Sequence, residues 1–115
     1  MKDLEEVRAR VAEFASERDW DKFHSPKNLA MALSVEVAEL VETFQWLTEA
    51  ESSSLSIEQL AAVGHEIADV QVYLVRLADR LGVDILQLVE EKMRLNAHKY
   101  PVLKVRGSAK KYTEY

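Results

Sequence analysis

The sequence predicts an all-α protein, a four-helix bundle within a chain of 115 residues. Apolar residues recur every three or four positions in four successive segments, which is the spacing of one helix face. Almost no segment alternates apolar and polar residues as a half-buried strand would. Capping sequences and prolines separate the four segments. A chain of this length is enough for one domain and too short for two ordinary ones.

The first predicted helix begins near Leu4 and ends near Trp20. Leu4, Val7, Val11 and Phe14 follow one another at the spacing of a single helix face. This face supplies apolar surface that a neighbouring helix can cover.

The second predicted helix runs from about Pro26 to Leu47. Ser25 followed by Pro26 is typical of a helix start, because a hydroxyl caps the first turn and proline fits its first position. The segment 48–54 is polar and rich in serine, so we expect a loop there.

The third predicted helix begins after Ser56 and ends at about Leu81. Ser56 and Gln59 have the spacing of a capping box, in which each side chain binds the other residue's backbone N–H. Gly82 is placed to end the helix, since glycine readily adopts the left-handed conformation that follows many helices.

The fourth predicted helix begins after Asp84, whose spacing to Gln87 repeats the capping pattern. It ends before Pro101, because the residue before a proline disfavours helix. We therefore expect a helical domain over residues 1–101, with 102–115 as a C-terminal tail belonging to the same domain.

Composition excludes several classes of function. The formal net charge of −5 makes the chain a poor candidate for binding nucleic acid polymers, which depends on basic residues. The sequence has no cysteine, which excludes disulfides and thiolate zinc sites. No apolar stretch reaches the roughly 18 residues of a membrane span, and the first ten residues do not resemble a secretory signal. We expect a cytoplasmic protein without a membrane partner.

The second and third predicted helices are apolar around more than half of their circumference. A helix in an isolated bundle needs an apolar stripe only about 100° wide. The excess predicts a second buried face on these helices, and therefore a homo-oligomer.

Two pairs of acidic residues interrupt the apolar faces of these same helices. Glu36 and Glu39 fall among the apolar residues of the second helix, as Glu66 and Asp69 do in the third. Ionised carboxylates in a shared interior cost several kcal/mol each unless protons, basic groups or cations compensate. Oxygen ligands suit Mg²⁺, or Mn²⁺ in its place. The pattern predicts a divalent metal site.

Other interpretations of the acids stay open at this point. They could be partly exposed residues at helix rims, or a redox carboxylate bundle, although such bundles normally pair Glu with His and neither acidic pair contains one. His65 could carry a phosphoryl group in a phosphotransfer bundle. The chain could also be a helical interaction module without enzymatic activity, which explains the wide apolar faces.

The acidic pairs resemble a known signature. Glu36-Val-Ala-Glu39 and Glu66-Ile-Ala-Asp69 match the E-x-x-E…E-x-x-D pattern of the MazG-like, all-α nucleoside triphosphate pyrophosphatases. From about Val11 onward the chain is more closely similar to the dCTP pyrophosphatase branch of that family. Val11 itself departs from the branch, whose eukaryotic members have a polar, substrate-contacting residue there. Further similarities are the segments 17–24, 44–46, 69–74, 100–101 and 106–109.

The resemblance implies hydrolysis of a nucleoside triphosphate between its α and β phosphates, giving monophosphate and pyrophosphate. The branch implies dCTP or modified dCTP as substrate, a house-cleaning role, and a homotetramer with sites between chains. The family implies magnesium on the four acids. We expect the same four acids to be the catalytic residues, and our hypothesis is that Glu36 or Glu39 deprotonates the attacking water. The implied base-binding residues are Trp20, Asp21, Lys22, Phe23, His24, Trp46 and Tyr73.

Spacing along the helices is consistent with a nucleotide site. Trp46 and Tyr73 each lie seven residues beyond an acid, roughly 10 Å along a helix, which is the reach from a triphosphate to its base. Lys92 and Asn96 lie four residues apart on the fourth predicted helix, as one polar stripe that could bind phosphate oxygens. An ordinary solvated face explains that stripe equally well.

Overall fold

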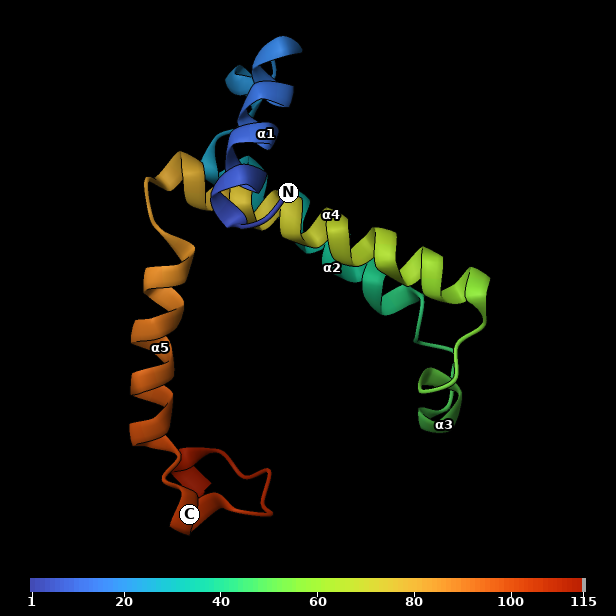
Figure 1. Cartoon of the computed structure of the whole chain (residues 1–115). Coiled ribbons are helices and arrows are strands. Elements are labelled where there is room, and N and C mark those ends of the chain that lie inside the picture. Colours follow the sequence, from blue (N-terminus) through green and yellow to red (C-terminus); the bar gives the residue numbers. More distant parts are fainter. Residues whose placement is uncertain (115) are drawn as a thin grey trace. The chain divides into compact units, whose positions relative to one another are not determined.

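The computed structural model describes residues 1–114, with only the backbone of Tyr112 (Figure 1). The described residues contain helices and no strand, so the predicted all-α class is confirmed. The α-helices are α1 (Leu4–Glu17), α2 (Pro26–Glu42), α3 (Glu49–Ser52), α4 (Ile57–Leu81), α5 (Ile85–Lys99) and α6 (Val102–Val105), and the 3-10 helices are η1 (Asp21–Phe23) and η2 (Tyr112–Glu114).

The predicted helix starts are confirmed by their capping hydrogen bonds. The Ser25 and Asp84 side chains accept from backbone N–H groups in the first turns of α2 and α5. Ser56 forms the full capping box with Gln59 at the start of α4. At the end of α4, Gly82 has a φ of 70°, the left-handed conformation expected of a terminating glycine.

Helix α1 ends at Glu17, earlier than the predicted end near Trp20. Asp19 takes a left-handed φ of 56°, which aspartate tolerates better than most residues, and this turns the chain out of the helix. The Trp20 N–H then donates to the carbonyl of Ala15 at 2.9 Å. Residues 21–23 form η1, so the chain crosses to α2 through a tight, hydrogen-bonded turn.

Helix α2 ends at Glu42, and the prediction that it continues to Leu47 is wrong. Thr43 donates its hydroxyl to the carbonyl of Leu40 at 2.6 Å, and its N–H also turns back to Leu40. Such local bonds compete with helical ones and loosen the last turn. The following segment up to Leu47 forms turns.

The polar segment 48–54, predicted as a loop, contains the short helix α3. Thr48 and Glu51 form a capping box at its start, a pattern present in the sequence that the serine-rich composition obscured. The segment after Pro101, predicted as a C-terminal tail, contains α6 and η2.

The chain divides into two compact units, Met1–Gly82 and Val83–Tyr115. In the first unit α2 packs along α4, and α1 packs against α4. The colours of Figure 1 show that α2 and α4 run in opposite directions. Five apolar residues, all in the first unit, are buried as its core: Ala15, Leu29, Val63, Val75 and Ala78. The predicted division into a domain 1–101 and a tail 102–115 stays a prediction.

A second apolar surface on α2 and α4 is exposed in the single chain. Met31 and Val35 on α2, with Leu60 and Ile67 on α4, are each more than half exposed. The prediction that these helices are apolar beyond their packed faces is therefore met. None of the described helices is long and apolar enough to cross a membrane.

Replacing Leu29 tests the core of the first unit. Leu29 is only 1% exposed, so Leu29→Ala should lower the free energy of unfolding by about 2–5 kcal/mol through lost burial and a cavity. Urea denaturation followed by circular dichroism measures the change. Leu103 is fully exposed on α6, and the matched control Leu103→Ala should stay within about 0.5 kcal/mol of the wild type. Equal effects of the two substitutions would contradict this account of the core.

Candidate active site

Three of the predicted acidic residues come together where α2 packs against α4. Glu36 and Glu39 extend from α2 and Glu66 from α4, and each offers one carboxylate oxygen within 4.8 Å of the other two. Asp69 lies one helical turn after Glu66, is exposed, and lines the pocket beside the cluster. We refer to Glu36, Glu39 and Glu66 as the acidic cluster.

The acidic cluster carries strong electrostatic repulsion. Burial raises the pKa of Glu36, and the hydrogen bond and negative charge of Glu39 raise it further. Burial also raises the pKa of Glu66, again followed by the charge of Glu39. Asp69 adds to both shifts, and Glu42 adds to that of Glu66. The carboxylates of Glu36 and Glu66 thus lie where their ionised forms are disfavoured.

The acidic cluster has the donor atoms that a divalent cation requires. Oε2 of Glu36 and Oε2 of Glu66 are buried, and neither has a hydrogen-bond partner among the described residues. Buried polar atoms normally have hydrogen-bond partners or ligands, so these two oxygens are candidate ligand atoms for a bound cation. Several close carboxylate oxygens suit Mg²⁺ or Mn²⁺, with waters and phosphates filling the remaining positions. The residues present therefore fit the metal that the sequence predicted.

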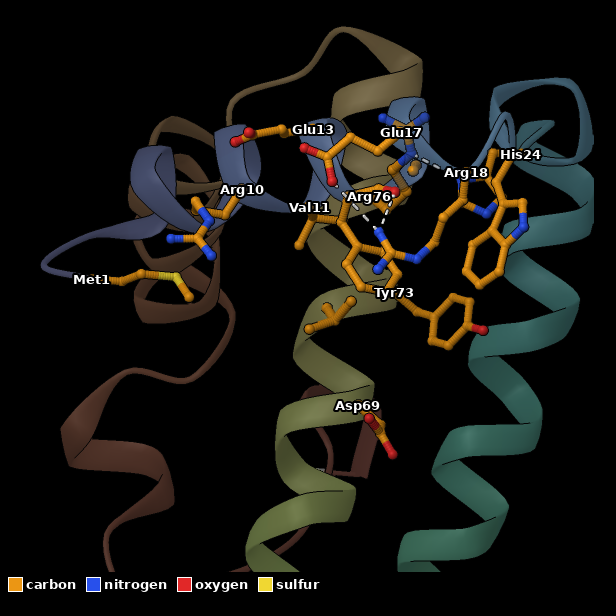
Figure 2. Close-up of a pocket in the computed structure, with 14 residues that line it drawn as sticks. Met1, Arg10, Val11, Glu13, Glu17, Arg18, His24, Asp69, Tyr73 and Arg76 are labelled. Carbon is orange, nitrogen blue, oxygen red and sulfur yellow. Dashed lines mark hydrogen bonds and ion pairs between the residues drawn. The ribbon is translucent and has the colours of Figure 1, made fainter.

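A pocket of about 870 Å³ lies between α1, η1 and α4 (Figure 2). Its volume falls in the range typical of small-molecule sites. Figure 2 shows Asp69, Tyr73 and Arg76 following one another along α4 into this pocket. Asp69 thus forms the end of the pocket that lies next to the acidic cluster. The other lining residues are Met1, Arg10, Val11, Glu13, Phe14, Ala15, Glu17, Arg18, Trp20, His24 and Val72.

Three of the predicted base-binding residues line this pocket: Trp20, His24 and Tyr73. The Trp20 ring contacts the Phe14 ring edge-on, at 5.7 Å between centroids, and the His24 ring at 6.4 Å. Trp20 keeps 42% of its surface exposed, so part of its ring stays available to a ligand.

The other predicted residues of segment 20–24 have different surroundings. Lys22 forms an ion pair with Asp19 at 2.9 Å and does not line the pocket. Phe23 is 58% exposed and likewise lies outside the lining. The Asp21 carboxylate accepts a hydrogen bond from Arg76. Direct contacts of these three residues with a substrate stay predictions.

Trp46 lies apart from the pocket and is 87% exposed in the turn after α2. Because α2 and α4 are antiparallel, the C-terminal end of α2 lies away from the C-terminal half of α4, which carries Tyr73. Within one chain, Trp46 and Tyr73 therefore lie on opposite sides of the acidic cluster. Counting residues along each helix separately could not show this.

Lys92 and Asn96 both lie on α5, in the second unit of the chain. Lys92 is exposed and Asn96 is half-buried. Their predicted contact with phosphate stays a prediction.

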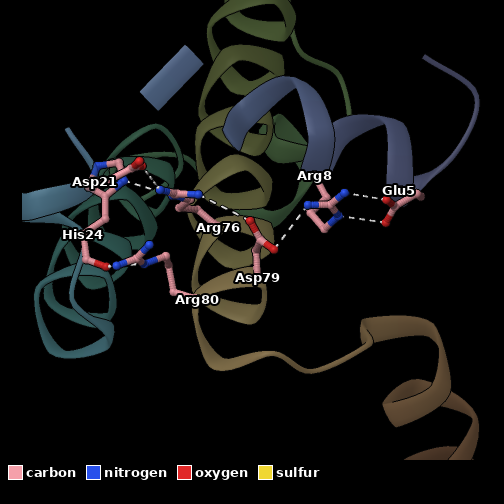
Figure 3. A network of polar contacts seen from close by, with 7 residues as sticks. All are labelled: Glu5, Arg8, Asp21, His24, Arg76, Asp79 and Arg80. Carbon is pink, nitrogen blue, oxygen red and sulfur yellow. Dashed lines mark hydrogen bonds and ion pairs between the residues drawn. The ribbon is translucent and has the colours of Figure 1, made fainter. Parts of the chain in front are cut away.

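Sequence reasoning missed Arg76, the single buried charged residue among the described ones, which is 4% exposed (Figure 3). Its guanidinium donates to Asp21 at 2.5 Å, to Nδ1 of His24 at 3.0 Å and to Asp79 at 3.3 Å. It lies seven residues after Asp69 and three after Tyr73, so it shares their helix face. That spacing was a usable signal, but a lone arginine on an amphipathic helix is usually solvated.

The fold and site define an all-α protein in which a cluster of carboxylates able to hold a metal ion lies beside an aromatic pocket. A family model described as the MazG-like family matches residues 31–115, and the chain belongs to this family. It is 49% identical over 113 residues to dCTP pyrophosphatase 1 of Rattus norvegicus and 48% identical to that of Homo sapiens. These matches cover 96% of the chain and 66% of each relative, so the chain spans about two thirds of their length.

A solved structure supports the fold independently. A pyrophosphatase from Archaeoglobus fulgidus aligns with a TM-score of 0.80 and 42% sequence identity. The alignment covers 84% of this chain and 91% of that protein.

Metal binding should depend on pH with a definite sign. Glu36 and Glu66 have raised pKa values when folded, so the metal-free folded protein binds protons that the unfolded chain has released. Its stability should fall as pH rises from the ordinary glutamate range through the raised values. Mg²⁺ binds the deprotonated carboxylates, so its stabilising effect should grow over the same range.

Thermal unfolding with EDTA and with Mg²⁺ over a pH series measures this effect. At 100 times its Kd, Mg²⁺ should add about 2.7 kcal/mol to the free energy of unfolding. Glu36→Gln serves as the control and should weaken both the metal effect and its pH dependence. A stabilisation independent of pH, or none, would contradict the metal site.

Proposed function

We propose that this protein is a magnesium-dependent nucleoside triphosphate pyrophosphohydrolase that acts on dCTP or modified dCTP in the cytoplasmic nucleotide pool. The observation that carries the proposal is the acidic cluster with unpartnered buried oxygens beside a pocket lined by Trp20 and Tyr73. The identity to proteins named dCTP pyrophosphatase 1 supports this substrate over other triphosphates. The products are nucleoside monophosphate and pyrophosphate.

The proposed substrate extends along α4. Its base lies in the pocket, where aromatic stacking contributes about 1–3 kcal/mol. Its phosphates lie at the acidic cluster, since Glu66 and Tyr73 are seven residues, roughly 10 Å, apart along one helix. Asp69 lies between them and belongs to both the pocket lining and the electrostatic field of the cluster.

The chemistry required of this chain is positioning and proton transfer. Bound Mg²⁺ would neutralise phosphate charge and orient the triphosphate. Water attacks the α-phosphorus, the bond from that phosphorus to the oxygen bridging to the β-phosphate breaks, and pyrophosphate leaves. Glu36 or Glu39 accepts the proton of the attacking water.

The functional form in this proposal is a homo-oligomer, a dimer or a tetramer built from two dimers. The exposed apolar surface of α2 and α4 supports it, because single chains rarely leave such a surface uncovered. Trp46 supports it as well, since it lies on the far side of the acidic cluster from Trp20. A second copy packed on this surface can bring Trp46 of the partner subunit to the pocket.

The activity is tested by pyrophosphate release from a panel of canonical and modified triphosphates with Mg²⁺. dCTP or its 5-substituted derivatives should give the highest kcat/KM, and Glu36→Gln should abolish turnover while the helical circular dichroism signal is kept. Glu58→Gln, at an exposed position of α4, is the matched control and should leave turnover unchanged. Retained activity in Glu36→Gln would contradict the assignment of Glu36 as a catalytic residue. Equal kcat/KM values for all triphosphates would remove only the preference for dCTP.

A shared site is tested by mixing two variants. Trp20→Ala and Trp46→Ala should each raise the KM, by about 10-fold for the loss of one stacking partner. When the two variants are co-expressed, random dimers should contain about a quarter of sites with both tryptophans intact. That fraction should show wild-type KM. Co-expression that assembles mixed oligomers without recovering any such sites would contradict a site shared between chains.

A further inference from the structure

We propose that Arg76 is a positioning residue that holds His24 in one tautomer, so that His24 donates a hydrogen bond from Nε2 to an acceptor on the substrate base. This inference rests on the proposed function, because it places a nucleotide base in the pocket. It assigns a role to a buried arginine that neither the acidic cluster nor the aromatic stacking requires.

The tautomer follows from the chemistry of the guanidinium. Nε of Arg76 lies 3.0 Å from Nδ1 of His24 (Figure 3). A guanidinium only donates hydrogen bonds, so Nδ1 must accept and cannot carry a proton. A neutral imidazole keeps one proton, which must then be on Nε2.

Arg76 is held rigidly enough to impose this choice. Its other nitrogens donate to Asp21 at 2.5 Å and to Asp79 at 3.3 Å, and Asp79 also accepts from Arg8 at 3.3 Å. The side chain is 5% exposed, and turning it would leave a buried charge without partners. Lysine cannot replace it, because a single ammonium lacks the planar set of donors that contacts three partners at once.

His24 is kept neutral and directed by the same surroundings. Burial lowers its pKa, the positive charges of Arg76 and Arg80 lower it further, and Asp21 opposes them in part. Arg80 also donates to the backbone carbonyl of His24 at 3.2 Å, which fixes the main chain. Nε2 of His24 has no hydrogen-bond partner within residues 1–114, and the residue lines the pocket beside Trp20.

The ligand chemistry follows from a fixed donor beside a stacking surface. Proteins that bind unpaired bases stack them on aromatic rings and hydrogen-bond their edges. A fixed N–H selects an acceptor, which in a cytosine base is the 2-carbonyl oxygen or the unprotonated ring nitrogen N3. The proposed partner of His24 is therefore the acceptor edge of a pyrimidine base.

The first measurement is NMR of the free protein with ¹⁵N-labelled histidine. Ring nitrogen shifts of His24 at neutral pH should show a single tautomer with the proton on Nε2. In Arg76→Lys, which keeps the positive charge but loses Nε, they should show a mixture of both tautomers. Arg80→Lys is the matched control, since Arg80 touches only the His24 backbone, and it should leave the tautomer unchanged. A wild-type proton on Nδ1 overturns the inference even if Arg76→Lys fails to fold.

The second measurement separates positioning from general structure. Arg76→Lys should raise the KM for dCTP about 5- to 10-fold, as expected for one lost hydrogen bond, with kcat changed far less. In a His24→Ala background the same substitution should add no further rise in KM. A rise of equal size in that background would show that Arg76 does not act through His24. If the wild type carries the His24 proton on Nε2 but does not hydrolyse dCTP, only the proposed function is refuted. If the wild type hydrolyses dCTP but carries the proton on Nδ1, only this inference is refuted.

Discussion

The repulsion between carboxylates where α2 meets α4 is the constraint on which the rest of the site depends. Glu36, Glu39 and Glu66 bring oxygens within 4.8 Å of one another, and two of those carboxyls hold buried oxygens without partners. Such a group destabilises the packed pair of helices unless a proton or a cation compensates it. The free energy of α2–α4 packing is therefore coupled to the binding of a proton or a cation at these three carboxylates.

Helix α4 combines two opposite electrostatic arrangements within about three turns. At Glu66 it presents acids without a basic partner, and at Arg76 it presents a buried base surrounded by acids. The first arrangement calls for an external cation, while the second is complete and rigid. This division is consistent with the proposed nucleotide substrate, whose phosphates would need a metal and whose base would need fixed, neutral donors and aromatic faces.

The sequence predicted local features well because they depend on neighbouring residues. The caps at Ser25, Ser56 and Asp84 and the turn at Gly82 follow from side-chain chemistry within a few positions. The acidic pairs were found because helical phase places them among apolar residues. The end of α2 was wrong by five residues, since the Thr43 hydroxyl competes for Leu40 in a way that apolar periodicity does not register.

The missed features depend on contacts between helices. Arg76 matters only because η1 brings Asp21 and His24 to it from more than fifty residues away, and Trp46 is separated from Tyr73 only because α2 and α4 are antiparallel.

The most direct test of the central claim is anomalous diffraction from crystals grown with Mn²⁺. The account predicts the strongest manganese peak among the carboxylate oxygens of Glu36, Glu39 and Glu66. Manganese bound elsewhere, with these three carboxylates protonated and bonded to one another, would contradict it.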